Sequence, residues 1–368
     1  MPRGVPIFLD RENYEDQILL HGTYCNWKSA QACPCVDDES NASDPNCEIC
    51  SGTGYTYYTQ TEFKINRERL DIGGSNVGIT KFGKIVSIDR VYDDDLTVAD
   101  FHGNQVIFNE RIPKSRRPAI DYTYSTVLDG HSVIGIYKGY GIIDIPNLTF
   151  QSTRGLEVPY EISNAINLVN LDVPSDTSLE VLDTYKNFVL VDKNFTIATV
   201  GDRIQMDIEY NAPHLMLVHG ISEEMKLKDA YMLPEADASC SVPNHLTLSK
   251  GDLIILVVSK QTASLVREFT DRAVTLDHYD VLGIERVVDD KGVLYQNGTD
   301  YVQIGRDRIE ALNDNLLIGK FSIKYFYRIM FMVMPNLPSL RYGENQPFPR
   351  HLMLKEYSRM KEETVKDV

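Results

Sequence analysis

Four of the six cysteines in this chain fall within eighteen consecutive residues. They form two close pairs, Cys33-Pro-Cys35 and Cys47-Glu-Ile-Cys50, which are separated by eleven residues. Two such pairs joined by a loop are typical of a tetrahedral thiolate site, because each pair brings two sulfurs to one ion and the loop lets the pairs meet. The spacing therefore predicts a Zn²⁺ ion held by Cys33, Cys35, Cys47 and Cys50.

Two alternatives to this ligand set stay open on the sequence alone. The four thiols could form two disulfides or pack as free side chains, although a bridge within Cys33-Pro-Cys35 would close a small, strained ring. His21 or Cys25, which lie just upstream, could also replace one of the four ligands. The isolated Cys240 is expected to be a buried, inert residue.

The kind of zinc site follows from the number of thiolates. A catalytic zinc keeps three protein ligands and one open position, whereas four thiolates leave no position free for water, so we expect a structural ion. The segment that it would hold, from Cys33 to about Tyr58, is almost entirely polar between the two pairs, so metal binding would drive its ordering. Gly52 and Gly54 follow the second pair and could turn backbone amides toward the sulfurs.

Length and charge limit the classes of protein to which the chain can belong. Its 368 residues suffice for two or three domains of ordinary globular composition. With 37 basic and 53 acidic residues the net charge is −16, which disfavours a surface that grips nucleic acid but suits one past which DNA slides. The chain shows no signal-peptide pattern, and its most apolar run, residues 329–334, is too short to cross a membrane. Its clustered cysteines therefore fit a reducing cytoplasm.

An internal repeat runs through the rest of the chain. Residues 84–94 (Lys-Ile-Val-Ser-Ile-Asp-Arg-Val-Tyr-Asp-Asp) and 280–290 (Asp-Val-Leu-Gly-Ile-Glu-Arg-Val-Val-Asp-Asp) share five identical and three conservative positions of eleven. A second part recurs three times, in residues 105–108 with 119–124, residues 187–191 with 201–210, and residues 300–304 with 319–327. Short alternating strands with frequent turn signals indicate small antiparallel β-sandwich or barrel units, although amphipathic strands can also resemble one another by chance.

These elements define the expected architecture. We expect a mainly β protein in which a small N-terminal zinc-binding module precedes repeated antiparallel β-sandwich or barrel-like domains and a short C-terminal helix. Residues 10–21 fit a short helix or an arm, and residues 349–363 fit the terminal amphipathic helix. The expected divisions are an N-terminal arm with the four-cysteine module at 1–60, β domains at 61–145, 146–220 and 221–335, and a C-terminal extension with its helix at 336–368.

No other pattern in the chain predicts catalysis. The eight histidines form no His-x-x-x-His or Glu-x-x-His pair, and no nucleophile elbow, P-loop or dinucleotide fingerprint occurs. His214 and His219 would point to opposite faces of a strand, so they could not share a ligand. We therefore expect a protein that is not an enzyme.

Taken together, these residues resemble structural proteins of tailed bacteriophages. The likeness rests on Cys33-Pro-Cys35, on residues 44–55 (Asp-Pro-Asn-Cys-Glu-Ile-Cys-Ser-Gly-Thr-Gly-Tyr) and on strand repeats of the type Arg-Val…Asp-Tyr…Gly…Tyr-x-Tyr. Residues 337–341 (Leu-Pro-Ser-Leu-Arg) and 348–354 (Phe-Pro-Arg-His-Leu-Met-Leu) add to it. The cysteine motif is fairly specific and the strand repeats are generic. The likeness is greatest to neck proteins, which join the head to the tail.

The resemblance implies a structural role in the virion. As a neck protein, that is, a head–tail connector or collar component, the chain would form a homo-oligomeric ring of six or twelve copies around an acidic or neutral channel for DNA. Its partners would be other virion proteins, such as the portal, an adaptor, the tail terminator or the sheath, without sequence-specific DNA binding and without a membrane. It would be made in the host cytoplasm and reside in the virion. The alternative is a structural protein of the baseplate or tail tip.

Overall fold

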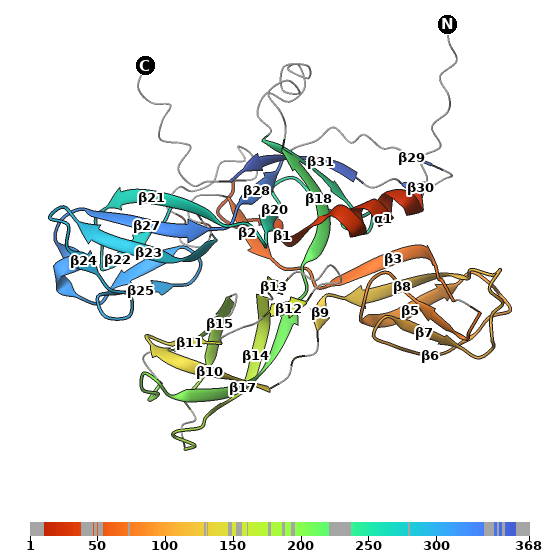
Figure 1. Ribbon diagram of the computed structural model, residues 1–368, viewed down its shortest axis with the longest axis horizontal. Helices are drawn as coiled ribbons and strands as arrows, with labels where there is room; N and C mark the ends of the chain where they lie inside the picture. Colours follow the sequence, from red (N-terminus) through yellow and green to blue (C-terminus); the bar gives the residue numbers. More distant parts are fainter. Residues whose placement is uncertain are drawn as a thin grey trace, which may run out of the picture.

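The described part of the chain is mainly β. The computed structural model describes residues 11–37, 47, 50, 54–72, 74–128, 130, 132–145, 149–151, 157–159, 161–175, 178–185, 188–192, 196–220, 237–278, 280–334, 342–343, 346–347 and 350–357. Within these residues antiparallel strands predominate, with one α-helix and one short 3₁₀-helix. A central barrel carries three β modules (Figure 1). The expected mainly β fold with repeated antiparallel units is confirmed.

A closed barrel of six antiparallel strands lies at the centre. The ring closes because β1 pairs with β18 through its first residues and with β20 through its middle. The order around the barrel is β1 (Thr23–Ala32), β18 (His214–Gly220), β19 (Ala238–Val242), β31 (Arg350–Glu356), β28 (Met330–Val333) and β20 (Leu253–Leu256). These strands come from three separate parts of the chain. The expected division into consecutive domains did not anticipate such a barrel, and its limits stay predictions.

The buried carboxylate of Asp252 links β1 to the start of β20 through hydrogen bonds. Trp27 Nε1 donates a hydrogen bond of 2.9 Å to Asp252 Oδ2, and the backbone N–H groups of Ala30 and Ser249 donate to the same side chain at 2.8 Å each. Asp252 is fully buried, so the three donors replace the water that its oxygens would otherwise bind. The barrel strand and the hairpin that continues from it are thereby held in one orientation.

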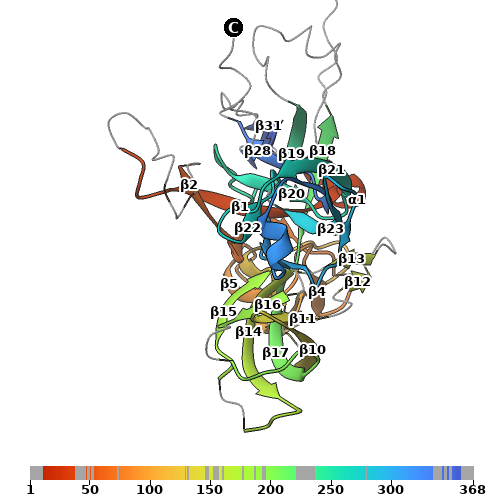
Figure 2. The same cartoon turned by 90° about the vertical axis from the view of Figure 1, so that its left-hand side faces the viewer.

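Beyond the barrel, β1 continues as one arm of a hairpin. Its last four residues pair with β2 (Tyr55–Tyr58), with Ser29 opposite Tyr58 and Ala32 opposite Tyr55. In Figure 2 this hairpin projects to the left of the barrel. The connection between its two strands contains all four clustered cysteines.

Three six-stranded modules branch from the barrel, and all have the same strand order. In each, the sixth strand pairs with the first and third strands, and the fifth strand pairs with the second and fourth strands. Module I consists of β3 (Glu62–Arg69), β4 (Val77–Ile79), β5 (Ile85–Val91), β6 (Val98–His102), β7 (Gln105–Phe108) and β8 (Ala119–Ser125). Module II consists of β10 (Ser132–Gly139), β11 (Ile142–Asp144), β14 (Glu161–Asn170), β15 (Val181–Tyr185), β16 (Phe188–Val191) and β17 (Arg203–Asn211). Module III consists of β21 (Gln261–Arg267), β22 (Ala273–Thr275), β23 (Val281–Asp289), β25 (Tyr301–Ile304), β26 (Arg308–Ala311) and β27 (Phe321–Tyr327).

The predicted repeat is matched even in the irregularities of its strands. The third strand of module I has register shifts after Ile85 and Ile88, and that of module III has them after Val281 and Ile284. These four residues occupy equivalent positions in the repeat seen in the sequence. One detail of the sequence alignment is wrong, because residues 105–108 (β7) and 188–191 (β16) form fifth strands whereas residues 301–304 (β25) form a fourth strand. Adjacent hairpin strands have similar apolar patterns, so sequence alone could not set this register.

The modules differ in how they join the barrel. In Figure 1, module III lies to the left, module I to the right and module II below the barrel. Module I shares one hydrophobic cluster with the barrel, in which Phe63 and Tyr122 belong to the same cluster as Trp27. Modules II and III each have a separate cluster of their own. In module II, pairing of β10 with β11 also joins the two sheets into one.

The remaining elements are short. Helix α1 (Arg11–His21) buries Ile18 completely and is tied to module I by an ion pair of 2.7 Å between Asp16 and Lys81. Of the two alternatives predicted for residues 10–21, a short helix or an arm, the helix is confirmed. The others are β9 (Val127–Leu128), β12 (Thr149–Gln151), β13 (Glu157–Pro159), β24 (Leu294–Tyr295), η1 (Asp314–Leu317), β29 (Tyr342–Gly343) and β30 (Gln346–Pro347).

The C-terminal helix expected over residues 349–363 is wrong for its first half. Residues 350–356 form β31, which completes the barrel between β19 and β28. Leu352 and Leu354 are buried at alternate positions, which is the spacing of a strand. The apolar residues there are compatible with a helix as well as with a strand. The strand forms because this segment pairs with two strands of the barrel. Residues 358–368 lie outside the described residues.

Candidate metal centre

The four clustered cysteines meet at the end of the β1–β2 hairpin. Cys33 and Cys35 follow β1 directly, and Cys50 precedes β2. The backbone N–H of Cys33 donates to the carbonyl oxygen of Gly54 at 2.9 Å, which extends the pairing of the two strands into the connection. The hairpin therefore brings the first pair of thiols to the second, as the loop between them allows.

The positions of the sulfurs fit one tetrahedral ion. All four Sγ atoms lie within 4.8 Å of one another, and none of the cysteines is in a disulfide. The Cys33 and Cys47 sulfurs are 3.8 Å apart, and the Cys35 and Cys50 sulfurs are 3.5 Å apart. A zinc–sulfur distance of about 2.3 Å places the sulfurs of a tetrahedral site about 3.8 Å apart. The four residues predicted from the sequence could therefore hold one metal ion.

A glycine amide supports this cluster. The Gly54 N–H donates to Cys50 Sγ at 3.3 Å, and Gly54 has a φ of 75°, in the left-handed region that glycine enters readily. Burial raises the pKa of the Cys50 thiol, but this hydrogen bond and the neighbouring sulfurs outweigh burial and lower that pKa to about 7. The expected role of Gly54 is thus confirmed. Gly52 and the residues at 38–46 lie outside the described residues.

The alternative ligands do not belong to the cluster. Cys25 and Cys240 are fully buried in the barrel, where burial raises the pKa of both thiols, that of Cys240 to about 12. His21 is exposed at the end of α1. Among the residues that the structure describes, the four clustered cysteines form the only group of three or more His, Cys, Asp or Glu side chains arranged to hold an ion.

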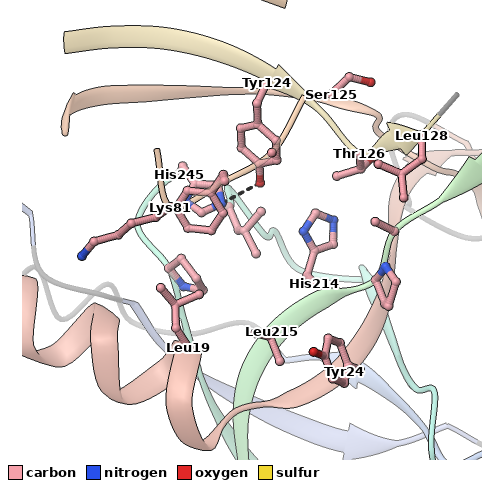
Figure 3. A pocket seen from close by; sticks show the side chains of 16 residues that line it. Leu19, Tyr24, Lys81, Tyr124, Ser125, Thr126, Leu128, His214, Leu215 and His245 are labelled. Atoms are coloured by element: carbon pink, nitrogen blue, oxygen red, sulfur yellow. Dashed lines mark hydrogen bonds between the residues drawn. The ribbon is translucent and has the colours of Figure 1, made fainter. Parts of the chain in front are cut away.

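A second candidate site is an apolar cavity of about 200 Å³ between α1, module I and the barrel. Figure 3 shows His214, from β18, beside the cavity. It also shows the hydrogen bond of 2.9 Å that joins the Tyr124 hydroxyl to His245 Nε2. His214 packs edge-on against Phe63, with ring centroids 4.9 Å apart. The described residues that line the cavity include no carboxylate. They therefore offer neither a nucleophile–His–acid array nor a pair of acids.

The half-buried His214 leads to a prediction about how stability depends on pH. Burial lowers the pKa of His214 to about 4 from its usual 6.5. Between these two pH values the unfolded chain binds a proton there and the folded chain does not, so stability falls as the pH is lowered through this window. The shift corresponds to about 3 kcal/mol. Denaturant unfolding of His214→Asn at several pH values should show a weaker dependence between pH 6.5 and 4. His219→Asn, on the exposed end of the same strand, should behave like the wild type.

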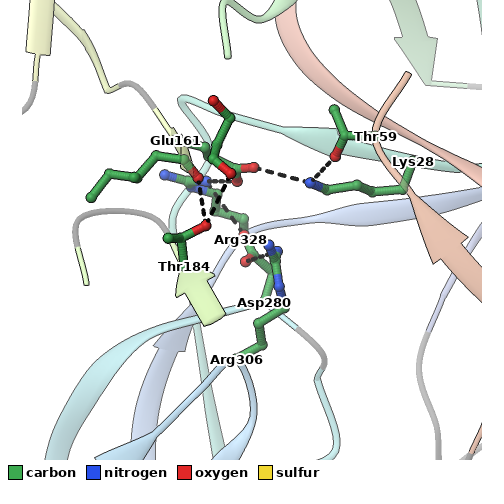
Figure 4. Close-up of polar contacts among 9 residues, drawn as sticks. Lys28, Thr59, Glu161, Thr184, Asp280, Arg306 and Arg328 are labelled. Atoms are coloured by element: carbon green, nitrogen blue, oxygen red, sulfur yellow. Dashed lines mark hydrogen bonds and ion pairs between the residues drawn. The ribbon is translucent and has the colours of Figure 1, made fainter. Parts of the chain in front are cut away.

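A buried ionic cluster joins the barrel to modules II and III (Figure 4). Glu161 lies at the centre, with Lys28 Nζ 3.3 Å from its Oε2 and Arg328 NH1 3.5 Å from its Oε1. The same Arg328 nitrogen is 3.5 Å from Asp280 Oδ2, and Arg306 NH1 is 3.8 Å from Asp280 Oδ1. The side chains of Glu161, Asp280 and Arg328 are at most 4% exposed. This cluster is therefore a structural junction.

Opposing effects set the ionisation in this cluster. Burial raises the pKa of Glu161, but the attraction of Lys28, Arg306 and Arg328 outweighs it and lowers that pKa to about 2. Burial also lowers the pKa of Lys28, which the attraction of Glu161 opposes. We infer an ionised pair, because three cations surround the carboxylate and hydrogen bonds from Lys28 to Glu161 and to Thr59 satisfy the ammonium.

Sequence reasoning missed this cluster, and the equivalence of its two carboxylates is seen only in the strand register. Glu161 and Asp280 both stand immediately before the first register shift of the third strand in their modules. Module I has Lys84 at this position. In the sequence repeat this position pairs Lys84 with Asp280, which is a mismatch and therefore gives no signal. The partners Lys28 and Arg328 come from distant segments and carry no local signal.

Comparison with known proteins adds no relative. The chain matches no protein-family model and no curated protein. No helix within the described residues has the length and apolar character needed to cross a bilayer. The function must therefore be inferred from the residues and their geometry.

Proposed function

We propose that the protein is a non-enzymatic structural component of a tailed-phage virion, and that it is a neck protein that assembles as a ring between head and tail. The proposal includes one structural Zn²⁺ per chain at the four-cysteine cluster. The architecture supports the assembly part of the proposal: three copies of one β module branch from a barrel, and within the described residues each ends in edge strands that could pair with another chain. Such edges are a common means by which β proteins associate.

The chemistry of the cysteine cluster supports a structural ion. Four thiolates complete a tetrahedral site, so no position remains for a reacting water. The cluster closes the end of a hairpin that leaves the barrel, where few apolar residues could hold the chain. Thiolate ligands in this geometry favour zinc over the hard cations Mg²⁺ and Ca²⁺.

The surface chemistry supports passage of DNA without tight binding. The net charge of −16 opposes adhesion to phosphates. The phage assignment and the neck position rest on the resemblance of residues 33–55 and of the strand repeats to that group of proteins.

Two measurements on the purified protein test this proposal together. We expect elemental analysis to find about one zinc per chain, and negative-stain images to show closed rings. A preparation that stays monomeric at high concentration, or one that binds no metal although its thiols are reduced, would contradict it. Localisation of the chain in virion images then separates the neck from the baseplate.

A further inference from the structure

Module I contains an open groove between two edge strands. A cavity of about 500 Å³ lies between β5 and β6, the last strands of their respective sheets. Its apolar surface comes from Ile88, Val91, Val98 and Phe101, which are only partly buried and pack on the core below. An edge strand presents a row of unpaired N–H and C=O groups, so this groove offers both hydrogen bonds and apolar contacts to an extended chain.

The equivalent position in module III is filled by the chain itself. There, the short strand β24 pairs with β23, and Tyr295 stands opposite Val287. The Tyr295 ring packs on Phe321, and Val287 is completely buried. Val91, the counterpart of Val287 in module I, remains partly exposed. Module III thus shows which kind of element occupies this position: an extended strand that covers the valine with a large apolar side chain.

Module II closes the same position in another way. Its third and fourth strands, β14 and β15, approach each other directly, and the Thr184 hydroxyl donates to the backbone oxygens of Ile162 and Ser163 at 3.2 and 3.4 Å. Among the three described copies, module I alone leaves the groove open. Since the three modules share one strand order, module I lacks an element that the other two have at this position.

We propose that the groove of module I binds residues 1–10 of a second copy of this chain, which add a strand to the edge of β5. This inference rests on the proposed function, because it supplies a contact between neighbouring subunits. Residues 1–10 precede α1 and lie outside the described residues. An extended segment of this length spans about 33 Å, which is ample to reach a neighbouring subunit.

The sequence of this segment suits an added edge strand. Val5, Ile7 and Leu9 alternate, so in a strand they would share one face and could cover the apolar side chains of a groove whose remaining surface is polar. In one of the two strand directions Pro6 has its nitrogen on the outer side, where an edge strand needs no N–H donor. The segment contains Arg3 and Asp10, and the groove is lined by the exposed Asp89, Arg90 and Asp100, so both carry charges of either sign. The alternation of apolar residues is thus the feature of the segment that fits this position.

The test compares point substitutions that the proposed pairing distinguishes. Ile7→Asp in the segment and Val91→Glu in the groove should each weaken self-association about tenfold or more, measured by analytical ultracentrifugation of the full-length protein. Phe8→Asp, whose side chain would face outward, and Val86→Glu, on the same strand and 44% exposed, should leave self-association unchanged. Thermal unfolding of all four variants checks that each is folded.

A cross-linking experiment identifies the donor chain. A photoreactive phenylalanine analogue at position 7, in a mixture of ¹⁴N- and ¹⁵N-labelled protein, should join peptides of unlike label and reach β5 or β6. Links only within one chain, or links elsewhere, would overturn the inference. Rings that form equally well with Ile7→Asp would overturn it too and would leave the proposed function intact. Failure of the wild type itself to assemble would instead count against the proposed function.

Discussion

Replacement of Glu161 by alanine is expected to lower the free energy of unfolding by about 3–5 kcal/mol. The substitution removes the carboxylate that Lys28 and Arg328 contact at the junction of the barrel with modules II and III. Lys28 then keeps its hydrogen bond to the Thr59 hydroxyl and Arg328 keeps its contact with Asp280, but three buried cations are left to share one carboxylate. Most of the cost is the desolvation of unpaired charge rather than the loss of two contacts. Denaturant titration, followed by tryptophan fluorescence of Trp27, measures the change.

An exposed ion pair in the same protein provides the control. Glu285 lies 2.8 Å from Lys324 in module III, but both side chains are about one-third exposed. Glu285→Ala should therefore cost about 1 kcal/mol or less, because water solvates the lysine that remains. If the two substitutions had equal effects, burial would not be the factor that makes the Glu161 cluster important.

Acid should weaken the same junction in the wild type. The folded-state pKa of Glu161 is lowered to about 2 from 4.5, so its contribution is fully present above pH 4.5 and is lost as the pH falls toward 2. The variant without the carboxylate should lack this part of the acid dependence.

Substitution of Cys50 by serine is expected to abolish stoichiometric metal binding and to release the β1–β2 hairpin. Structural zinc sites contribute apparent binding free energies of about 10–16 kcal/mol in zinc-finger peptides, and one lost thiolate removes a large share of that stabilisation. Hydrogen exchange should accelerate in β2 and at the end of β1, from Ser29 to Ala32. Exchange in β19, within the barrel core, should change little, because that strand has its own buried contacts.

Cys240→Ala separates loss of the site from loss of any cysteine. Cys240 is fully buried in the barrel, so its truncation should lower stability while the metal content stays at one ion per chain. Chelation of the wild type should reproduce the exchange pattern of Cys50→Ser. A chelated protein whose hairpin exchanges as slowly as before would show that the ion does not hold this segment.

Sequence reasoning succeeded where the relevant information is local. The spacing of Cys33, Cys35, Cys47 and Cys50 predicted a cluster that the structure shows, because a hairpin loop brings together residues that are close in sequence. The repeat between residues 84–94 and 280–290 was likewise visible, since strand alternation and turn residues are read from neighbouring positions.

Tertiary structure alone decided the features that combine distant segments. Residues 350–356 form a strand because they pair with both β19 and β28, and only an extended segment can make backbone hydrogen bonds to two neighbouring strands. The contact of Lys28 with Glu161 spans 133 residues and follows from the docking of modules on the barrel. By itself, the sequence determined a mainly β chain with a four-thiol cluster and repeated modules. The closed barrel, the buried junction and the open groove of module I arise only when those parts pack, because their energies come from burial between segments that no local pattern links.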